Sequence, residues 1–442
     1  MHRKVLIAVD SFKREYLGIY LLKKELLKNG FKVRICSRYV LKYAFNHFRP
    51  EVVVVHSSYK IAELEEISRQ AVLILLQAES CTGNELGILS YAAEISPLTR
   101  PEFIDFRYCW GKFDYDILKK HPVFPNAGLA VTGHPITDPW YRKRAPRKSK
   151  ELTIGIATSL RAMTHISGAI GNPIKFIHDI EEGGQTSLFF EAPYHAEAWV
   201  AFEAAWLRIL LDLVKNLKGY KVKIRPHPIE KIEYYRFLEK KFGVEVSNHE
   251  DLSEWLESVD VMISYLSTAQ LAAYVRGVNV ISIKNLFPVY IHNTLPAAIT
   301  FELDQYFHAP SSIEELKNSL KENKCDREKL DHYASQMFNF PSKDRPSVLI
   351  AEHLAGFVEE KLKTKAKFKR IPEGRITNLI PDFIPKDTLL MLYRDWFYPK
   401  EQVSLSYCRH RFLRNRRVHR TLPDFENKDL KRDERAIPVV AR

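Results

Sequence analysis

Lys221 to Glu230 read KVKIRPHPIE, in which alternating polar and apolar residues lead into Arg-Pro-His-Pro. The alternation predicts a short β-strand. Because proline cannot donate a ladder hydrogen bond, a strand that meets two prolines has to leave its sheet. We therefore expect His227 just past the carboxyl end of a strand, which is where open α/β sheets bind their ligands.

A second strand end of this kind follows further along the chain. Asp260 to Tyr265 (DVMISY) is a short apolar run, and Ser267 and Thr268 then precede a helical pattern. Backbone amides at a helix start, with hydroxyls beside them, are typical of an anion site. We hypothesise that His227, on the neighbouring strand, faces Ser267 and Thr268 and that they hold a phosphate between them. Arg225 would add positive charge. The alternatives are a histidine packed in a proline-rich turn and an ordinary Ser/Thr helix cap.

The length and the charge of the chain suggest two domains and an appendage. The chain has 442 residues, 45% of them hydrophobic, which suffices for two cores. Its net charge is +13. From Lys361 to Arg442 there are 21 basic and 10 acidic residues, which leaves 46 basic and 44 acidic residues upstream. The body is therefore close to neutral, and the tail is basic.

The amino-terminal part alternates apolar runs with helical patterns. Strands are predicted over Lys4 to Asp10, Phe31 to Ser37, Glu51 to His56 and Ala71 to Gln77. Of these, the continuous β-branched run from Glu51 to His56 is of the kind that is buried on both faces of a parallel sheet. Strands that alternate with helices predict a doubly wound α/β domain. No Gly-x-Gly-x-x-Gly follows the first strand, so a dinucleotide-binding domain loses its main support.

The stretch from Asp138 to Lys150 (DPWYRKRAPRKSK) is polar, charged and contains prolines, which indicates a linker between domains. We predict an amino-terminal Rossmann-like domain over residues 1–140, on the acceptor side, and a linker over 141–150. A second Rossmann-like domain, on the donor side, follows over 151–360. A basic, aromatic tail occupies 361–442.

The cysteines and the amino terminus indicate the compartment. The five cysteines are scattered and form no CxxC pair, which fits a reducing environment and argues against a zinc site. The apolar stretch after the first residues, up to Asp10, is far shorter than the core of a signal peptide or a spanning helix. We therefore expect a cytoplasmic protein.

The motifs, taken in order, resemble those of a known family. They are Trp110-Gly-Lys, Val131-Thr-Gly-His-Pro-Ile-Thr-Asp138, Arg225-Pro-His-Pro, Ser267-Thr268 with the helix to Gly277, and Val278-Asn-Val-Ile-Ser. Over roughly residues 1–360 the sequence resembles the bacterial surface-carbohydrate (capsule and lipopolysaccharide) biosynthesis proteins. These are GT-B glycosyltransferases that include CMP-Kdo-dependent β-Kdo transferases. The sequence departs from the family at His134, where Asn is usual, and at Gln77-Ala-Glu79, where an acidic run ending in glycine is usual.

The resemblance implies an α/β fold of two Rossmann-like domains facing a cleft, of GT-B type, with a basic carboxyl-terminal extension. It implies a glycosyltransferase that moves Kdo or a related acid sugar from a CMP donor to a surface glycan or its lipid-linked precursor. The alternatives on the same fold are a UDP- or GDP-sugar transferase, a polyol-phosphate transferase and a nucleotide-sugar epimerase. An alternative of another class is a non-catalytic, nucleotide-binding assembly partner. No cofactor is expected beyond the nucleotide-sugar substrate.

Transfer from a nucleotide sugar needs charge stabilisation at the leaving phosphate and a carboxylate or histidine near the anomeric carbon. We predict Glu79, just past a buried strand, as the base, and His165, in a long loop of the second domain, as a contact with donor or acceptor. Further candidates are Asp138, Asp179, Glu181, Glu182 and Glu191. The alternative for each of them is a solvated loop residue. No Asp-x-Asp pair ends a strand, so a divalent metal is not expected.

The tail combines an apolar, aromatic stretch, Leu389 to Phe397, with six arginines between Arg409 and Arg420. Basic residues interleaved with aromatic ones suit an anionic membrane surface. Nucleic acid is the competing partner, which we do not favour, and a solvated tail is the third alternative. We therefore expect a peripheral protein on the inner face of the cell membrane.

Overall fold

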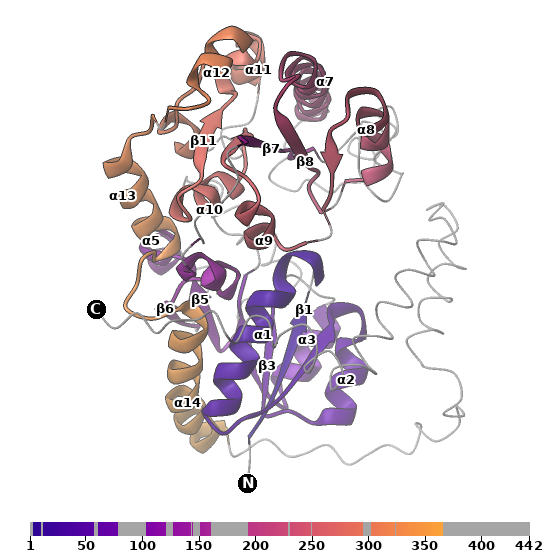
Figure 1. Cartoon of the computed structure of the whole chain (residues 1–442). Coiled ribbons are helices and arrows are strands. Elements are labelled where there is room, and N and C mark those ends of the chain that lie inside the picture. The colour runs from indigo at the N-terminus through magenta and orange to yellow at the C-terminus, as the bar shows by residue number, and fades with distance from the viewer. Residues whose placement is uncertain are drawn as a thin grey trace, which may run out of the picture.

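The chain forms two α/β domains, each built on one parallel sheet (Figure 1). The structure is a computed structural model, and it describes residues 3–9, 12–56, 61–77, 103–120, 127–142, 144, 151–160, 193–228, 230–248, 250–294, 302–322 and 324–365. Within that part of the chain, no helix is both long and apolar enough to cross a membrane.

The first sheet has six parallel strands in the order β2-β1-β3-β4-β5-β6. Its strands read as near-continuous apolar runs because helices cover both faces. The elements up to the end of this sheet are β1 (Lys4–Val9), α1 (Phe12–Lys28), β2 (Lys32–Ser37), η1 (Arg38–Val40), α2 (Leu41–Phe48), β3 (Val52–Val55), α3 (Ile61–Ser68), β4 (Val72–Leu75), β5 (Phe106–Cys109), α5 (Lys112–Lys120) and β6 (Gly128–Val131). Helices α2, α3 and α5 pack on one face, and α1 packs on the other.

The second sheet has five parallel strands in the order β11-β10-β7-β8-β9. Its elements are β7 (Thr153–Ala157), α7 (Pro193–Asn216), β8 (Lys221–Arg225), η4 (Ile232–Tyr235), α8 (Arg236–Phe242), β9 (Glu245–Val246), α9 (Leu252–Glu257), β10 (Val261–Ser264), α10 (Ala269–Val275), β11 (Asn279–Ser282), η5 (Lys284–Leu286), α11 (Val289–Thr294), η7 (Glu302–Gln305), α12 (Ile313–Ser319) and α13 (Arg327–Phe338). After β7, the chain adds β8 and then β9 on one side of that strand. It then crosses back and adds β10 and β11 on the other side. The strand order therefore reverses between β7 and β10, and such switch points are the usual ligand sites of open α/β sheets.

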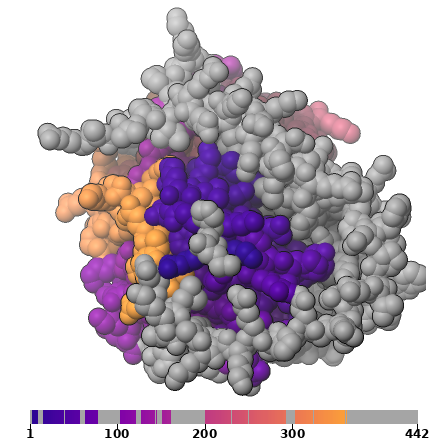
Figure 2. Space-filling model, turned by 90° about the horizontal axis from the view of Figure 1, so that it is seen from below, coloured from indigo at the N-terminus to yellow at the C-terminus, as the bar shows by residue number. Residues whose placement is uncertain are grey.

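The last described helix, α14 (Pro346–Lys365), belongs to the core of the first domain. Its apolar side chains Ile350, Ala351, Leu354 and Val358 are buried with those of α1 and β1. Figure 2 views this end of the molecule and shows orange atoms of the carboxyl-terminal part beside indigo atoms of the amino-terminal part. The predicted second domain, 151–360, thus includes a helix that packs on the first sheet. The apolar pattern of a helix shows that it has a buried face but not which sheet covers that face.

The two domains meet where α13 ends against the start of α5. The Trp110 ring lies 5.6 Å from that of Phe338, edge to face. A β-carbon at Gly111 would stand 2.1 Å from the carbonyl oxygen of Gln336, so the close backbone approach requires glycine there. This contact gives the Trp110-Gly-Lys motif a structural role at the seam between the domains.

The connection between the domains is held from both sides. It begins with η3 (Pro135–Tyr141), which packs against α1 and α14. The buried Arg276 of the second domain donates to the carbonyl oxygens of Pro139, at 2.8 Å, and Arg142, at 3.2 Å. Helix η3 therefore packs against both domains, and Trp140 is buried among residues of the second. Most of the predicted linker, 145–150, lies outside the described residues.

The fold predicted from the sequence is confirmed. Both domains are parallel α/β layers of Rossmann-like type, and the predicted strands after the linker form one sheet. The basic extension after Lys365 lies outside the described residues.

Candidate functional site

The carboxyl ends of β7, β8 and β10 lie at one edge of the second sheet. Strand β7 pairs with β8 on one side and with β10 on the other. The prediction that His227 and Ser267 leave neighbouring strands is therefore wrong, because β7 runs between them. Their strands are separated by two strand spacings, about 10 Å. A ligand that both residues contact must cross the end of β7.

The buried carboxylate of Glu230 ties the loops after β7 and β8 together. Its Oε1 accepts hydrogen bonds from the backbone N–H of His227 at 2.8 Å and from that of Leu160 at 3.1 Å. The Thr158 hydroxyl donates to the same oxygen at 2.8 Å, and the Tyr235 hydroxyl donates to the other oxygen. Burial raises the pKa of Glu230 to about 7, although these donors favour the ionised form. Glu230 thereby fixes the backbone that carries the half-buried His227.

A second buried carboxylate, Asp304, holds the loop after β10. Leu266 has a φ of 50°, a left-handed conformation that is uncommon for residues other than glycine. Its N–H donates to Asp304 Oδ2 at 3.1 Å, while Gln270 Nε2 and Ser282 Oγ donate to Oδ1 at 2.8 Å and 2.9 Å. Burial raises the pKa of Asp304 to about 6. Since strained residues cluster at binding sites, the conformation of Leu266 makes the next two residues candidates for function.

Those two residues are Ser267 and Thr268, at the start of α10. The Ser267 hydroxyl accepts from the N–H of Ala269 at 3.3 Å, as a local cap does. Thr268 is exposed, and its side chain makes no capping hydrogen bond. The Ser267 hydroxyl thus caps the helix through its oxygen and keeps its own O–H as a donor, whereas the Thr268 side chain does not cap the helix.

Arg225 is directed into the domain. Its Nη2 donates to the carbonyl oxygen of Glu250 at 2.9 Å, and its guanidinium carbon lies 5.9 Å from the ring centre of Trp255. Burial lowers the pKa of Arg225, against the raising effect of nearby carboxylates such as that of Glu250. These contacts fasten the segment after β9 to β8. A contact between Arg225 and a phosphate stays a prediction.

Among the predicted catalytic carboxylates, Asp138 has a structural role. It is 2% exposed, and its Oδ1 accepts from the backbone N–H of Ser347 at 3.1 Å. Ser347 lies in the first turn of α14, so Asp138 caps that helix from the first domain. Burial raises the pKa of Asp138 to about 7. The other predicted residues, Glu79, His165, Asp179, Glu181, Glu182 and Glu191, lie outside the described residues.

The carboxyl edge of the first sheet holds a cluster of buried polar side chains. The Nδ1 of His134 accepts from the N–H of Ile136 at 3.1 Å and so caps η3, and its ring stacks on Trp110 at 4.6 Å. Asparagine is a good residue at such a cap, which explains how His134 can stand where the resembling family has Asn. His56 and Glu15 are fully buried nearby, with Nδ1 and Oε2 4.0 Å apart.

Sequence reasoning missed the two anchoring carboxylates. Glu230 ends the KVKIRPHPIE stretch, three residues after His227, and that spacing allows a carboxylate to reach back to the histidine N–H. Asp304 has no such local signal, because the loop it holds lies far away in the sequence. Within the part of the chain that the structure describes, no group of three or more His, Cys, Asp or Glu side chains could hold a metal ion.

Two Rossmann-like domains joined by a short connection, with a final helix that returns to the first domain, define the class as the GT-B fold. Solved structures support this class. The wall teichoic acid polymerase TagF aligns with a TM-score of 0.50 and 11% identity, covering 82% of this chain and 90% of that one. A TagF variant with histidine replaced by asparagine, soaked with CDPG, aligns with a TM-score of 0.51 and 11% identity, covering 83% and 90%.

S. aureus MnaA with UDP aligns less well, with a TM-score of 0.46 and 12% identity, covering 82% of this chain and 97% of that one. No family model and no curated sequence matches the chain. At such low identities the likeness to TagF shows the fold and nothing more.

Proposed function

We propose that this protein is a GT-B glycosyltransferase that uses a nucleotide-activated sugar. Our first choice is Kdo or a related acid sugar from a CMP donor, transferred to a surface glycan or its lipid-linked precursor. The observation that carries the proposal is the edge of the second sheet, where the Ser267 loop borders the switch point between β7 and β10 and the His227 loop follows β8, on the other side of β7. Buried carboxylates fix both loops, as expected for a site that must be preorganised.

The chemistry follows from the residue types at that edge. Cleavage of the donor leaves negative charge on a phosphate, which the imidazole of His227 and the hydroxyls of Ser267 and Thr268 are suited to stabilise by hydrogen bonds. The acceptor hydroxyl needs a base, or a retaining reaction needs a nucleophile. For that role we propose Glu79, with His165 in contact with donor or acceptor.

A polyol-phosphate transferase is the second candidate. It is favoured by the fold likeness to TagF, of which a variant was soaked with CDPG. In such a reaction the bond that breaks lies between the two phosphates of the donor, and the leaving group is a nucleoside monophosphate. The same two loops would then face a diphosphate, which is long enough to reach across the end of β7.

A thermal-shift panel of CMP, CDP, UDP and GDP tests the proposal, with cytidine as the phosphate-free control. We expect cytidine nucleotides to raise the melting temperature of the intact protein and cytidine to have less effect. CMP is the leaving nucleotide of both candidates, so a shift with CMP supports either of them. A larger shift with CDP, which carries the second phosphate of a diphosphate donor, favours the polyol-phosphate transferase. If no nucleotide shifts the melting temperature, the proposal is wrong.

We also propose that the tail holds the enzyme on an anionic membrane, because a lipid-linked acceptor would be found there. The predicted tail is 361–442, but α14 extends to Lys365. Removing residues 366–442, the part of the tail that follows this helix, should release the protein from vesicles with anionic lipid and leave nucleotide binding unchanged. Replacing Leu389, Leu390, Trp396 and Phe397 with serine should weaken vesicle binding, since burying each such side chain is worth about 1.5 to 3 kcal/mol. Tight binding to RNA without vesicle binding would contradict this part of the proposal.

A further inference from the structure

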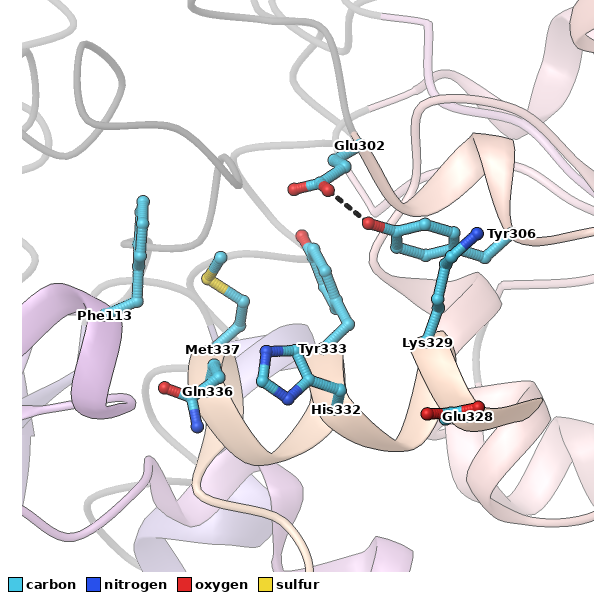
Figure 3. Close-up of a pocket in the computed structure, with 9 residues that line it drawn as sticks. All are labelled: Phe113, Glu302, Tyr306, Glu328, Lys329, His332, Tyr333, Gln336 and Met337. Atoms are coloured by element: carbon cyan, nitrogen blue, oxygen red, sulfur yellow. Dashed lines mark hydrogen bonds between the residues drawn. The ribbon is translucent and has the colours of Figure 1, made fainter. Parts of the chain in front are cut away.

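A cavity of about 540 Å³ opens at the seam between the two domains, away from the loops after β8 and β10. Its volume lies within the usual range of small-molecule sites. Phe113, in the first turn of α5, comes from the first domain, whereas Tyr306, Tyr333 and Met337 come from the second. Figure 3 shows Phe113 apart from the side chains of the second domain, with Met337 between Phe113 and Tyr333. The walls of the cavity are therefore aromatic and belong to both domains.

Polar groups stand at the rim of this cavity. The Tyr306 hydroxyl donates to Glu302, and this contact orients the carboxylate beside the ring (Figure 3). The Tyr306 and Tyr333 rings lie 6.2 Å apart and are steeply tilted. His332, next to Tyr333 on α13, adds an exposed imidazole. Apolar ring faces next to hydroxyl, carboxylate and imidazole groups are complementary to a sugar ring, which has an apolar C–H face and an edge of hydroxyls.

The charges argue against a nucleotide at this place. Glu302 and Glu328 contribute two carboxylates to the lining. The cationic Lys329 is paired with Asp326, with Nζ and Oδ2 3.0 Å apart. A phosphate would meet uncompensated negative charge, whereas hydroxyl groups can donate to those carboxylates. The ligand class that fits is therefore a neutral carbohydrate.

The cavity is linked to the candidate donor site by η7. This short helix places Asp304 under the loop after β10, through its bonds to Leu266 and Gln270. Glu302, at the start of the same helix, lines the cavity. A ligand that binds Glu302 would therefore contact the same short helix that carries Asp304, the residue that holds the Ser267 loop.

We propose that this cavity binds one neutral sugar unit of a glycan, which packs against Phe113, Met337 and Tyr333 and is hydrogen-bonded to Glu302. The assignment of that glycan as the acceptor rests on the proposed function, whereas binding of the sugar itself does not.

Saturation-transfer NMR on the full chain tests the inference, with the methyl glycosides of glucose, galactose, mannose and N-acetylglucosamine as probes at millimolar concentration. We expect at least one of them to bind. Phe113→Ala and Glu302→Gln should each weaken that binding by about fivefold, the loss expected for one aromatic or polar contact. The matched control is Phe237→Ala, which removes a ring that is 62% exposed on α8 and should leave binding unchanged.

Two results overturn the inference: no probe binds to the wild-type protein, or binding survives in both Phe113→Ala and Glu302→Gln. Thermal-shift measurements with CMP and CDP on the same samples test the proposed function separately. Sugar binding without any nucleotide shift would leave the cavity a carbohydrate site and reject the transferase. A nucleotide shift without sugar binding would support the proposed function and reject the cavity as a carbohydrate site.

Discussion

The carboxyl edges of the two sheets occupy equivalent topological positions and yet differ in character. At the edge of the first sheet, His56 and His134 are fully buried, and Trp110 packs against the second domain. At the edge of the second sheet, His227 is half-buried and Thr268 is exposed. Within the described residues, the polar side chains His56 and His134 of the first edge are packed in the interior. At the second edge, His227 and Thr268 are accessible to solvent, and the buried carboxylates of Glu230 and Asp304 hold the loops that carry them.

This difference shows that a histidine at a strand end is not in itself evidence of a binding site. His134 caps η3 and stacks on Trp110, so these contacts account for its presence. His227 instead follows a strand whose loop is fixed from below by Glu230. His134 is fully buried and its ring nitrogen accepts a hydrogen bond from the backbone, which indicates a structural role. His227 is only half-buried and its backbone N–H is held by Glu230, which makes His227 the candidate for function.

The largest effect is expected for His227→Ala. Removing a donor to a charged phosphate costs about 1.5 to 3 kcal/mol, so donor turnover should fall at least about tenfold. His134→Asn, at the first edge, is the matched control and should change turnover per folded molecule little. Steady-state rates with the nucleotide donor that binds best decide between these outcomes. If turnover falls equally in His227→Ala and His134→Asn, the two sheet edges do not differ in function as proposed here.

Gly111→Ala tests the first edge as a packing surface. The new β-carbon would meet backbone atoms of α13, at 2.1 Å from the oxygen of Gln336 and 2.5 Å from the carbonyl carbon of Met337. We expect a loss of about 1 to 3 kcal/mol in the free energy of unfolding, measured in urea. Gly356→Ala in α14 is the control, because its β-carbon would meet nothing within 4 Å. A Gly111→Ala protein as stable as wild type would show that the domains do not pack tightly there.

The double change Ser267→Ala and Thr268→Ala sharpens the assignment of the second edge. Each lost hydrogen bond is worth about 0.5 to 1.5 kcal/mol, so nucleotide affinity should fall several-fold to roughly a hundredfold. Affinity for the free nucleoside should be unaffected, as titration calorimetry can show. If both ligands weaken alike, the two hydroxyls contact something other than a phosphate.

The last effect concerns pH. The pKa of Glu230 rises from 4.5 to about 7 on folding, so the folded protein binds a proton there that the unfolded chain has released. Its contribution to stability is present below about pH 4.5 and is lost as the pH rises to about 7. In Glu230→Gln, the amide oxygen can still accept from the N–H groups of His227 and Leu160, and the side chain does not titrate. Between pH 4.5 and pH 7, the melting temperature of the wild type should fall more steeply with rising pH than that of the variant. If the two melting temperatures change with pH in parallel, Glu230 does not titrate in this way.

Several features could be predicted from the sequence because they depend on local pattern. Continuous apolar runs such as Val52–Val55 indicate strands covered on both faces, and the helices between them require a parallel sheet. The two prolines after Arg225 place His227 at a strand end. Neither inference requires knowledge of which strands become neighbours.

Only the tertiary structure decided which parts of these patterns meet. It placed β7 between β8 and β10, brought Asp304 under Leu266, and made Asp138 the cap of α14. The sequence shows that a residue is polar or that a helix has an apolar face, since those properties belong to the residues themselves. Which partner covers that face, and whether a carboxylate is buried, depends on contacts between segments far apart in the chain.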